Sequence, residues 1–214
     1  MQDGLKNSRI NYEKGILLEA TAEKNPFDQF SNWLNDAQSE NIPDFNAFTL
    51  STLNRDGYPQ SRILLLRAHD RSGLQFFTNY GSNKAKELDF NEKVSMNFYW
   101  NTLERQVRVL GIARKTSEAE SDDYFNSRPR ESQIAAWASI QSSELRTREE
   151  LEANVEKYTK EFEGKPVPRP AFWGGFRVVP HYFEFWQGRP SRLHDRLVYK
   201  VTEDFEWFIY RLAP

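Results

Sequence analysis

Residues 47 to 116 contain five stretches in which apolar and polar side chains alternate, and short turns join most of them. Such alternation places successive side chains on opposite faces of a β-strand, and Asn, Asp and Gly at the turns favour antiparallel hairpins. A short helix, AKELDFN, separates the third stretch from the fourth. The pattern predicts a β-barrel or a closed antiparallel sheet. The predicted strands are AFTLSTL (47–53), YPQSRILLLRA (58–68), LQFFTNY (74–80), KVSMNFYW (93–100) and LERQVRVLGIARKT (103–116).

Helical patterns lie on both sides of this β-rich part. Asn25 and Pro26 favour the start of a helix, and apolar side chains from Phe27 to Ala37 recur on one of its faces. The sequence predicts a mainly β fold with surrounding α-helices (α+β), with a flexible segment at 1–24 and a single domain at 25–214. Three more helices are predicted at 117–127, 131–140 and 147–162, and four more strands at 172–179, 181–186, 195–201 and 205–211.

The composition excludes several classes of site and partner. The chain has no cysteine, so disulfides, thiolate nucleophiles and cysteine-bound zinc or iron–sulfur centres are excluded, and three widely spaced histidines do not indicate a metal site. A net charge of −2 argues against bulk binding to nucleic acid or to a membrane. No signal peptide or 18-residue apolar run is present, so a cytoplasmic protein is expected.

The stretch FEFWQGRPSRLHDR, residues 183–196, concentrates aromatic and cationic side chains. If its second half is extended, Arg192, His194 and Arg196 point to the same face. Two guanidinium groups beside an imidazole repel one another unless an anionic or electron-rich group lies between them. The alternative is a surface strand with solvated arginines, and the residues alone leave both interpretations open.

A first candidate anion site follows from the predicted strands. Arg62 and Arg67 bracket the apolar run 63–66, which is predicted to be covered on both faces. Lys84 stands at the start of the short helix, where backbone N–H groups favour an anion, and Thr78 can add a hydroxyl donor. The arrangement resembles a phosphate cradle without a glycine-rich loop. Ordinary charges at strand ends are the alternative.

A second candidate anion site lies in the helical region. Tyr124 and Arg128 are adjacent on a helix face, and Ser132 falls in the first turn of the next helix. The alternative is a helix–helix corner with capping serines. No hydrolase, zinc or dinucleotide motif occurs, so chemistry has to come from a bound cofactor or from Arg and His. Two phosphate-type sites with many aromatics point to two phosphorylated ring ligands.

Several motifs together resemble the pyridoxamine (pyridoxine) 5′-phosphate oxidase family. They are FEFWQGRPSRLHDR, TLERQVRVLG (102–111), YFNSRPRESQIAAW (124–137), QSS (141–143), FWGGFRV (172–178) and the terminal RLAP. The resemblance implies an FMN-binding split β-barrel and a homodimer with FMN at the subunit interface. It also implies oxidation of pyridoxamine or pyridoxine 5′-phosphate to pyridoxal 5′-phosphate by O₂, with release of H₂O₂, and of ammonia from the amine. Hydride would pass from substrate C4′ to flavin N5.

The resemblance also implies roles for individual residues. Arg62 and Lys84 would hold the FMN phosphate, Arg192 and His194 would be catalytic, and Arg9 and Tyr12 would form a mobile lid. The implied FMN contacts are Arg62, Ile63, Leu64, Leu65, Leu66, Arg67, Phe77, Thr78, Lys84, Gln106, Gln141, Ser142, Trp186 and Arg196. The implied substrate contacts are Arg9, Tyr12, Arg67, Tyr124, Arg128, Ser132, Arg192 and His194, with Arg67, Tyr124, Arg128 and Ser132 on the phosphate.

Three positions depart from the family pattern. Arg67 stands where many members have Lys, Asn83 where an Arg is common, and Phe77 where a Tyr is common. The loss of a charge at Asn83 predicts somewhat weaker FMN binding. Two other functions are considered, namely a related split-barrel flavoenzyme such as a phenazine-biosynthesis oxidase, and a non-enzymatic carrier of flavin or pyridoxal phosphate. Retention of the whole substrate set argues against the first of these.

Overall fold

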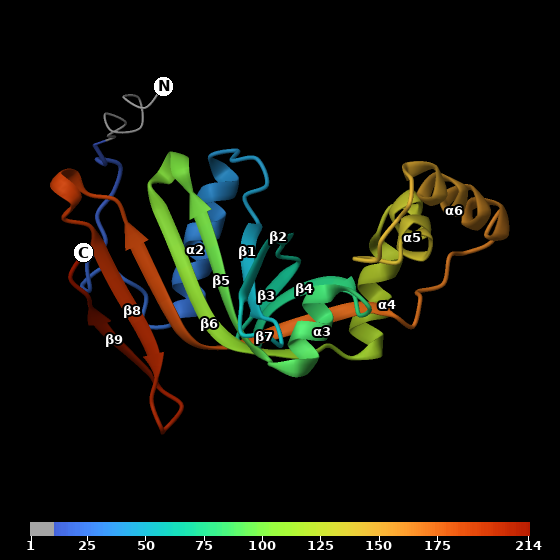
Figure 1. Ribbon diagram of the computed structural model, residues 1–214. Coiled ribbons are helices and arrows are strands. Elements are labelled where there is room, and N and C mark those ends of the chain that lie inside the picture. Colours follow the sequence, from blue (N-terminus) through green and yellow to red (C-terminus); the bar gives the residue numbers. More distant parts are fainter. Residues whose placement is uncertain (1–10) are drawn as a thin grey trace.

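The computed structural model describes residues 11–214, in which one antiparallel sheet of nine strands curls along its length (Figure 1). The strand order is β2-β1-β5-β6-β7-β4-β3, with β8 paired to β7 and β9 to β8. The predicted mainly β fold with surrounding helices is confirmed. The strands are β1 (Ala47–Leu53), β2 (Pro59–Leu65), β3 (Ala68–Asp70), β4 (Gly73–Asn79), β5 (Lys93–Trp100), β6 (Arg105–Lys115), β7 (Trp173–Gln187), β8 (Asp195–Val201) and β9 (Trp207–Arg211).

Strand β7 organises the sheet, because β6 runs along one of its edges while β4 and β8 share the other. Its first half pairs with β4 up to Val178, and its second half pairs with β8 from Tyr182. The prediction of two strands broken near residue 180 is therefore wrong. Pro180 lies between the two pairings, where its missing N–H removes no ladder hydrogen bond on that edge, and a register shift beside Gly111 absorbs one extra residue.

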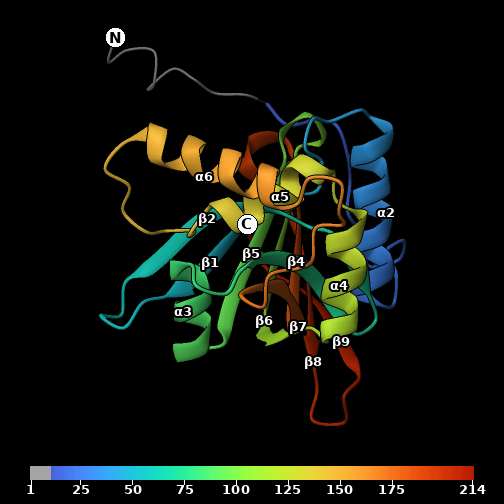
Figure 2. The ribbon, with the colours of Figure 1, turned by 90° about the vertical axis from the view of Figure 1, so that its right-hand side faces the viewer.

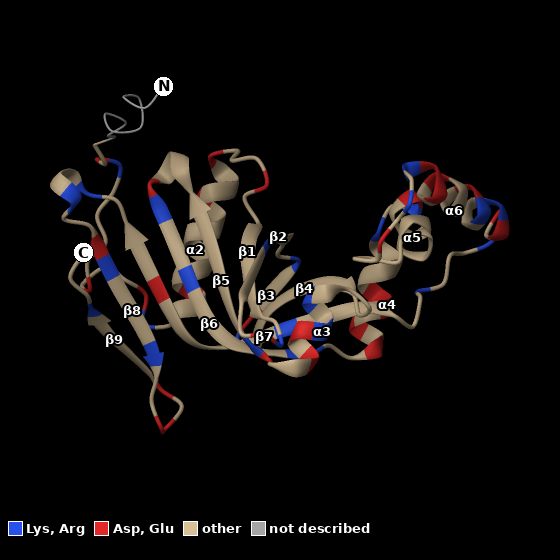
Figure 3. Cartoon of the chain, viewed as in Figure 1, with Lys and Arg blue, Asp and Glu red and all other residues tan. Residues whose placement is uncertain are grey.

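The helices lie on different sides of the sheet (Figures 1 and 2). Asn25 caps the first of them by accepting a hydrogen bond from the backbone N–H of Phe27, as its sequence predicts. Charged side chains of both signs cover the last helix, which buries none of its residues (Figure 3). The helices are α2 (Pro26–Ser39), α3 (Asn83–Phe90), α4 (Glu118–Ser127), α5 (Arg130–Ala138) and α6 (Arg148–Glu161).

Two hydrophobic clusters are buried. The larger fills the space between α2 and the sheet, where Phe30, Phe98 and Phe183 are fully buried. The smaller joins α4, α5 and the end of α6 to Trp173 at the beginning of β7. Helices α4, α5 and α6 are thus fixed to the sheet by a core of their own. A cavity forms at the boundary between the two clusters.

The apolar run at residues 63–66 was predicted to be covered on both faces, and within this chain that prediction is wrong. Strand β2 lies at the edge of the sheet and the side chain of Ile63 is 74% exposed. Leu66, by contrast, is buried in the larger core. Among residues 11–214, no helix is both long enough and apolar enough to span a lipid bilayer.

Candidate functional site

A cavity of about 390 Å³ opens between the β2 and β4 strands and helices α4 and α5. Its wall combines residues of β2 and β4 with the last turns of α4 and α5, so both hydrophobic clusters are needed to shape it. Nine residues that the sequence marked as ligand contacts line it: Ile63, Leu64, Leu65, Arg67, Phe77, Thr78, Tyr124, Arg128 and Gln141. Residues of both candidate anion sites therefore contribute to a single cavity.

Lys84 lies at the first turn of α3, and the residue is only 8% exposed. Its Nζ donates to Thr78 Oγ1 at 3.1 Å, Ser82 Oγ at 3.2 Å and Gln141 Oε1 at 3.0 Å. Burial, followed by the nearby charge of Arg62, lowers the pKa of Lys84 to about 8. A buried ammonium group with three neutral partners lacks a counter-charge at hydrogen-bond distance, which suits a site for an anion.

Arg62 does not share this property. Its Nη2 lies 2.9 Å from Glu87 Oε2 and its Nη1 donates to the backbone oxygen of Gln60 at 3.0 Å. The ion pair balances the charge of Arg62 within the chain, so of the two cations expected to hold a phosphate, Lys84 carries the unbalanced charge. The role of Arg62 stays a prediction.

Stacked aromatic rings form the opposite wall of the cavity. The rings of Phe77 and Tyr124 stack with centroids 3.9 Å apart, and Tyr124 lies nearly parallel to Trp173 at 6.1 Å. The guanidinium of Arg67 lies 5.8 Å from the Tyr124 ring, and that of Arg128 lies 4.6 Å from the Trp173 ring. The two guanidinium groups thus lie beside the stacked rings, and the Tyr124 hydroxyl can donate a further hydrogen bond to an anion.

Arg128 carries the clearest sign of a missing partner. Its Nη1 is buried and has no hydrogen-bond partner among residues 11–214. Burial, with a smaller contribution from Arg67, lowers the pKa of Arg128. A buried donor without an acceptor costs free energy of about 1–3 kcal/mol, and more when charged. Such a group fits a site whose acceptor is a ligand.

Besides Arg62 and the implied contacts near Trp186, four further implied contact residues do not line the cavity. Leu66 belongs to the core, and Ser132 lies in the first turn of α5. Ser142 adopts a positive φ of 71° and its hydroxyl accepts from the backbone N–H of Asn83 at 3.3 Å. Lys84 lies behind the wall, in contact with Thr78 and Gln141.

A second group of the implied residues lies near the ends of β6, β7 and β8. Trp186 pairs with Gln106 on one side and with Arg196 on the other, so these three side chains form one row on one face of the sheet. The ring of His194 lies 4.7 Å from the Trp186 ring. Tyr12 contacts both rings edge-on, at 5.6 Å from Trp186 and 5.7 Å from His194.

The extended conformation predicted for residues 192–196 is wrong in its first half. Pro190 begins a 3₁₀ turn, and Ser191 and Arg192 follow with positive φ angles of 57° and 63°. These angles reverse the chain, and β8 begins only at Asp195. Arg192, His194 and Arg196 therefore do not share a face through strand alternation.

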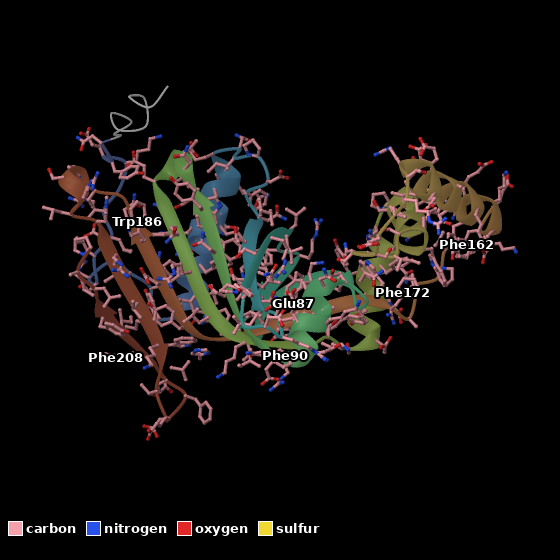
Figure 4. The ribbon with its side chains drawn as sticks, in the orientation of Figure 1. Glu87, Phe90, Phe162, Phe172, Trp186 and Phe208 are labelled. Atoms are coloured by element: carbon pink, nitrogen blue, oxygen red, sulfur yellow. The ribbon has the colours of Figure 1, made fainter. Side chains whose placement is uncertain are left out.

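These two groups of implied contacts are far apart within the chain. Trp173 borders the cavity and Trp186 lies near the other end of β7, at most about 40 Å away at roughly 3.3 Å per residue. Figure 4 shows Trp186 and Phe172 at opposite ends of the molecule. We call the residues around the cavity the cavity cluster, and Tyr12, Gln106, Trp186, Arg192, His194 and Arg196 the tryptophan cluster. Arg9 lies outside the described residues.

Two acidic residues that support the tryptophan cluster were not singled out from the sequence. The Glu104 carboxylate accepts from the backbone N–H groups of Glu13 and Lys14 at 2.8 and 2.9 Å. Glu184 is buried and paired with Arg108 and Arg196. An acid inside the apolar run FEFW was the only local signal, since charged residues are rarely buried without a partner.

Comparison with known families agrees with this arrangement. A family model described as "Pyridoxamine 5'-phosphate oxidase" matches residues 34–161, and one described as "Pyridoxine 5'-phosphate oxidase C-terminal dimerisation region" matches residues 173–214. The chain belongs to the pyridoxamine 5′-phosphate oxidase family. The tryptophan cluster, apart from Tyr12 and Gln106, falls within the part that matches the dimerisation region.

Individual relatives agree over nearly the full length. The chain is 50% identical to "Pyridoxine/pyridoxamine 5'-phosphate oxidase" of Bordetella pertussis over 96% of this chain and 97% of that protein. It is also 50% identical to the protein of the same name from Synechocystis, over 98% of both. The crystal structure of PhzG from Burkholderia lata, in complex with tetrahydrophenazine-1-carboxylic acid, superposes with a TM-score of 0.87 at 30% identity, covering 93% of this chain and 98% of that one.

A more distant structure shares the fold. The pyridoxamine 5′-phosphate oxidase-related, FMN binding protein of Nostoc punctiforme superposes with a TM-score of 0.70 at 14% identity, covering 89% of this chain and 98% of that one. This likeness confirms the predicted split-barrel architecture.

Proposed function

We propose that this protein is an FMN-dependent oxidase that converts pyridoxamine 5′-phosphate and pyridoxine 5′-phosphate to pyridoxal 5′-phosphate. The observation that carries the proposal is the buried, unpartnered Nη1 of Arg128 in a cavity that also presents Arg67 and Tyr124. A phosphate monoester supplies both the negative charge and the acceptor oxygens that these groups lack. The 50% identity to two oxidases named for these substrates supports the choice of phosphate ester.

FMN fits the cavity cluster on chemical grounds. The Lys84 ammonium, with neutral partners only, suits the flavin phosphate, and the wall residues 63–65 and Phe77 offer backbone and apolar surface to a flat ring. When bound, FMN accepts a hydride from substrate C4′ and passes the electrons to dioxygen, which yields hydrogen peroxide. With the amine substrate, water hydrolyses the resulting imine to the aldehyde and ammonia, whereas oxidation of the alcohol gives the aldehyde directly.

The substrate phosphate would be held by Arg67, Tyr124 and Arg128, with Ser132 at the start of α5 as a further donor. A clamp of this kind fixes one end of the pyridine ring, so that the reacting carbon is restricted to a small volume. Because Arg128 is already half-buried and oriented by its contact with Trp173, little side-chain freedom is lost on binding. Arg67 and Arg128 also exclude weakly charged ligands, since each prefers an anion to water.

We propose further that the two clusters meet across a homodimer, with FMN at the subunit interface. One chain separates the clusters by most of the length of β7, whereas residues 173–214 match a region described by its role in dimerisation. A two-fold axis creates two equivalent sites, each with the cavity cluster of one protomer and the tryptophan cluster of the other. The exposed Ile63 at the edge of β2 would then be covered.

His194 would act as a hydrogen-bond donor to the substrate. The backbone N–H of Arg189 donates to His194 Nδ1 at 3.1 Å, so Nδ1 is unprotonated and the neutral ring carries its proton on Nε2. Burial, followed by the charge of Arg192, lowers the pKa of His194 and keeps the ring neutral. Arg192 would keep the substrate amine in its neutral form, because neighbouring cations favour loss of its proton.

Anaerobic reduction of the flavin tests the oxidase activity. The purified holoenzyme should lose its visible flavin absorption when pyridoxamine 5′-phosphate is added without oxygen, and air should restore it. Pyridoxamine without phosphate should bleach the flavin far more slowly, because it cannot engage Arg128. A bound flavin that stays oxidised with the phosphate ester would contradict the proposal and favour a carrier.

Two arginine variants sharpen that test. Arg128→Met should raise the KM for pyridoxamine 5′-phosphate by about 10- to 100-fold, which corresponds to loss of a charged hydrogen bond of about 1.5–3 kcal/mol. The matched control is Arg130→Met, because Arg130 donates to the backbone oxygens of Lys165 and Phe162 and lies outside the cavity cluster. It should lower the melting temperature and leave KM unchanged. Equal KM effects of the two variants would remove the assignment of Arg128.

A second candidate function follows from the structural likeness to PhzG, with a TM-score of 0.87. A related flavoenzyme acting on a tricyclic carboxylic acid would use the same cavity with a carboxylate in place of the phosphate. The same anaerobic assay distinguishes the two, because such an enzyme would be bleached by a reduced phenazine carboxylic acid and not by pyridoxamine 5′-phosphate.

A further inference from the structure

Glu184 is a buried acid next to the tryptophan cluster, and the proposed reaction assigns it no role. It lies in the second half of β7, and its side chain is only 3% exposed. Residues two apart on a strand share a face, so Glu184 lies on the same face as Trp186. The Gln106–Trp186–Arg196 row and the Glu184 side chain therefore form one continuous polar surface.

Four donor contacts satisfy the Glu184 carboxylate. Arg196 reaches Oε1 through both Nε and Nη2 at 2.8 Å, whereas Arg108 Nη1 and the Tyr182 hydroxyl reach Oε2 at 2.9 Å each. Burial alone would raise the pKa of Glu184, but the hydrogen bonds from Arg196 and Tyr182 hold it below its ordinary value. The acid is therefore an anion that faces two cations.

Residues near the C-terminus also hold Arg196. Its Nη1 donates to the backbone oxygen of Ala213 at 2.8 Å, and its own backbone oxygen accepts from the N–H of Leu212 at 3.0 Å. A guanidinium held through three of its nitrogens has one orientation, because its fork is planar and rigid. The side chain is still 25% exposed, which leaves N–H groups directed away from the protein.

We infer that Glu184 is a positioning residue, which holds the guanidinium of Arg196 beside Trp186 in the orientation that contacts the flavin. The inference rests on the proposed function, because it takes Arg196 to be a flavin ligand. Glu184 itself touches neither flavin nor substrate. It restricts the side-chain conformations of Arg196 before the flavin binds, so less conformational entropy is lost on binding. Its negative charge also reduces the repulsion between Arg108 and Arg196, which both lie on this face.

A double-mutant cycle tests this inference through flavin affinity, without any turnover. FMN is titrated into apoprotein of the native chain, Glu184→Gln, Arg196→Gln and the double variant, and the dissociation constant is read from flavin fluorescence. Glu184→Gln keeps the shape of the side chain but loses the charge that orients Arg196, so FMN binding should weaken by about tenfold. The double variant should bind FMN no more weakly than Arg196→Gln alone, because Glu184 acts only through Arg196.

The matched control is Glu120→Gln, which removes another arginine-bound carboxylate outside both clusters. Glu120 pairs with Arg177 at 2.7 Å and also accepts from Gln75. This variant should lose stability and keep native FMN affinity. If Glu184→Gln does not fold, Glu184→Asp retains the charge but withdraws it from Arg196 by one methylene, and a weaker affinity for FMN is again expected.

Three outcomes would overturn the inference, and they differ in what else they affect. Additive losses in the cycle, or native affinity in Glu184→Gln, would show that Glu184 does not act through Arg196, and the proposed function would stand. Native FMN affinity in Arg196→Gln would remove Arg196 from the flavin site and with it part of the proposed function.

Discussion

At the scale of single residues, the site is defined by cations that lack a counter-charge. Lys84 is buried, Arg128 is half-buried with its Nη1 enclosed, and desolvation lowers the pKa values of both. Arg62, by contrast, is neutralised by Glu87. A protein that keeps a buried charge unbalanced loses stability, so such groups mark positions where a ligand completes the balance. The two unbalanced cations therefore mark where two phosphates are expected.

The lowered pKa of Lys84 predicts that FMN affinity falls and that the stability of the apoprotein rises as the pH increases above about 8. Below pH 8 the ammonium is charged and ready for an anion, so FMN affinity should be constant between pH 6.5 and about 8. Above that value FMN binding must take up a proton, and affinity should fall by up to about tenfold per pH unit. The stability of the apoprotein should rise over the same range, because the unfolded chain, with an ordinary value of 10.5, binds more protons than the folded one.

Equilibrium titration with FMN at pH 7, 8 and 9 checks this prediction, alongside thermal unfolding of the apoprotein. The flavin phosphate is already doubly ionised in this range, so it adds little dependence of its own. Lys84→Arg is the matched control, because a guanidinium stays charged and should flatten the curve. An unchanged pH dependence in that variant would remove Lys84 from the phosphate site.

Some of these residues could be predicted from the sequence and others could not. Tyr124 and Arg128 lie four apart on one helix, and Thr78 and Lys84 flank one turn, so local geometry brings each pair together. Glu104 acts on residues about ninety positions away, and no local pattern reports such a contact. The two consecutive positive φ angles at Ser191 and Arg192 could not be predicted either, since neither residue is glycine.

At the scale of elements, β7 and the segment before α2 determine where the tryptophan cluster lies. Residues 11–25 form no helix or strand, yet their path is fixed by contacts with the sheet. The Glu104 carboxylate accepts two backbone N–H groups from this segment, and Lys14 Nζ donates to the backbone oxygen of Thr102 at 2.7 Å. These contacts place Tyr12 over Trp186 and His194, where Gly188 leaves it room.

We therefore expect Glu104 to control closure of this segment over the substrate. Glu104→Gly removes both hydrogen bonds and suits the positive φ of 54° at this position, so the turn should persist. Proteolytic cleavage within residues 11–17 should accelerate by about tenfold, and the KM for the substrate should rise several-fold, whereas FMN affinity should stay native.

The conservative variant Glu104→Gln still offers an amide oxygen to the same N–H groups, and it should restore most of the native behaviour. Limited proteolysis with mass spectrometry gives the cleavage rate, and steady-state kinetics gives KM. Native cleavage rates in Glu104→Gly would mean that the segment is held by its other contacts alone.

The elements themselves were largely predictable, since alternation and capping residues are local signals. The start of α2 at Pro26 and five of the six strands of residues 47–116 follow from such patterns, whereas the short strand β3 was not predicted. The continuity of β7 through Pro180 does not, because a proline inside a strand usually ends it, and only the change of partner from β4 to β8 makes it harmless. The exposure of β2 depends on its position at the edge of the sheet, and the strand order cannot be read from local sequence patterns.

At the scale of the whole molecule, the separation of the two clusters is the central feature. Motif resemblance alone treats their residues as one site, whereas the structure places them at opposite ends of β7. Each cluster lacks what the other has, since one offers a cavity lined by Arg67 and Arg128, and the other offers Trp186, His194 and Arg196. We propose that residues 25–214 form one domain and that two such domains build two complete sites.

A complementation experiment tests this assembly most directly. Arg128→Met disables the cavity cluster and His194→Ala the tryptophan cluster, so each homodimer should have little activity at substrate concentrations near the native KM, where the assays are made. Co-expression with two affinity tags isolates the heterodimer. If each site draws on both protomers, one of its two sites is native, and it should recover about half of the native activity per dimer. A heterodimer no more active than the two parental homodimers would contradict a site shared between protomers.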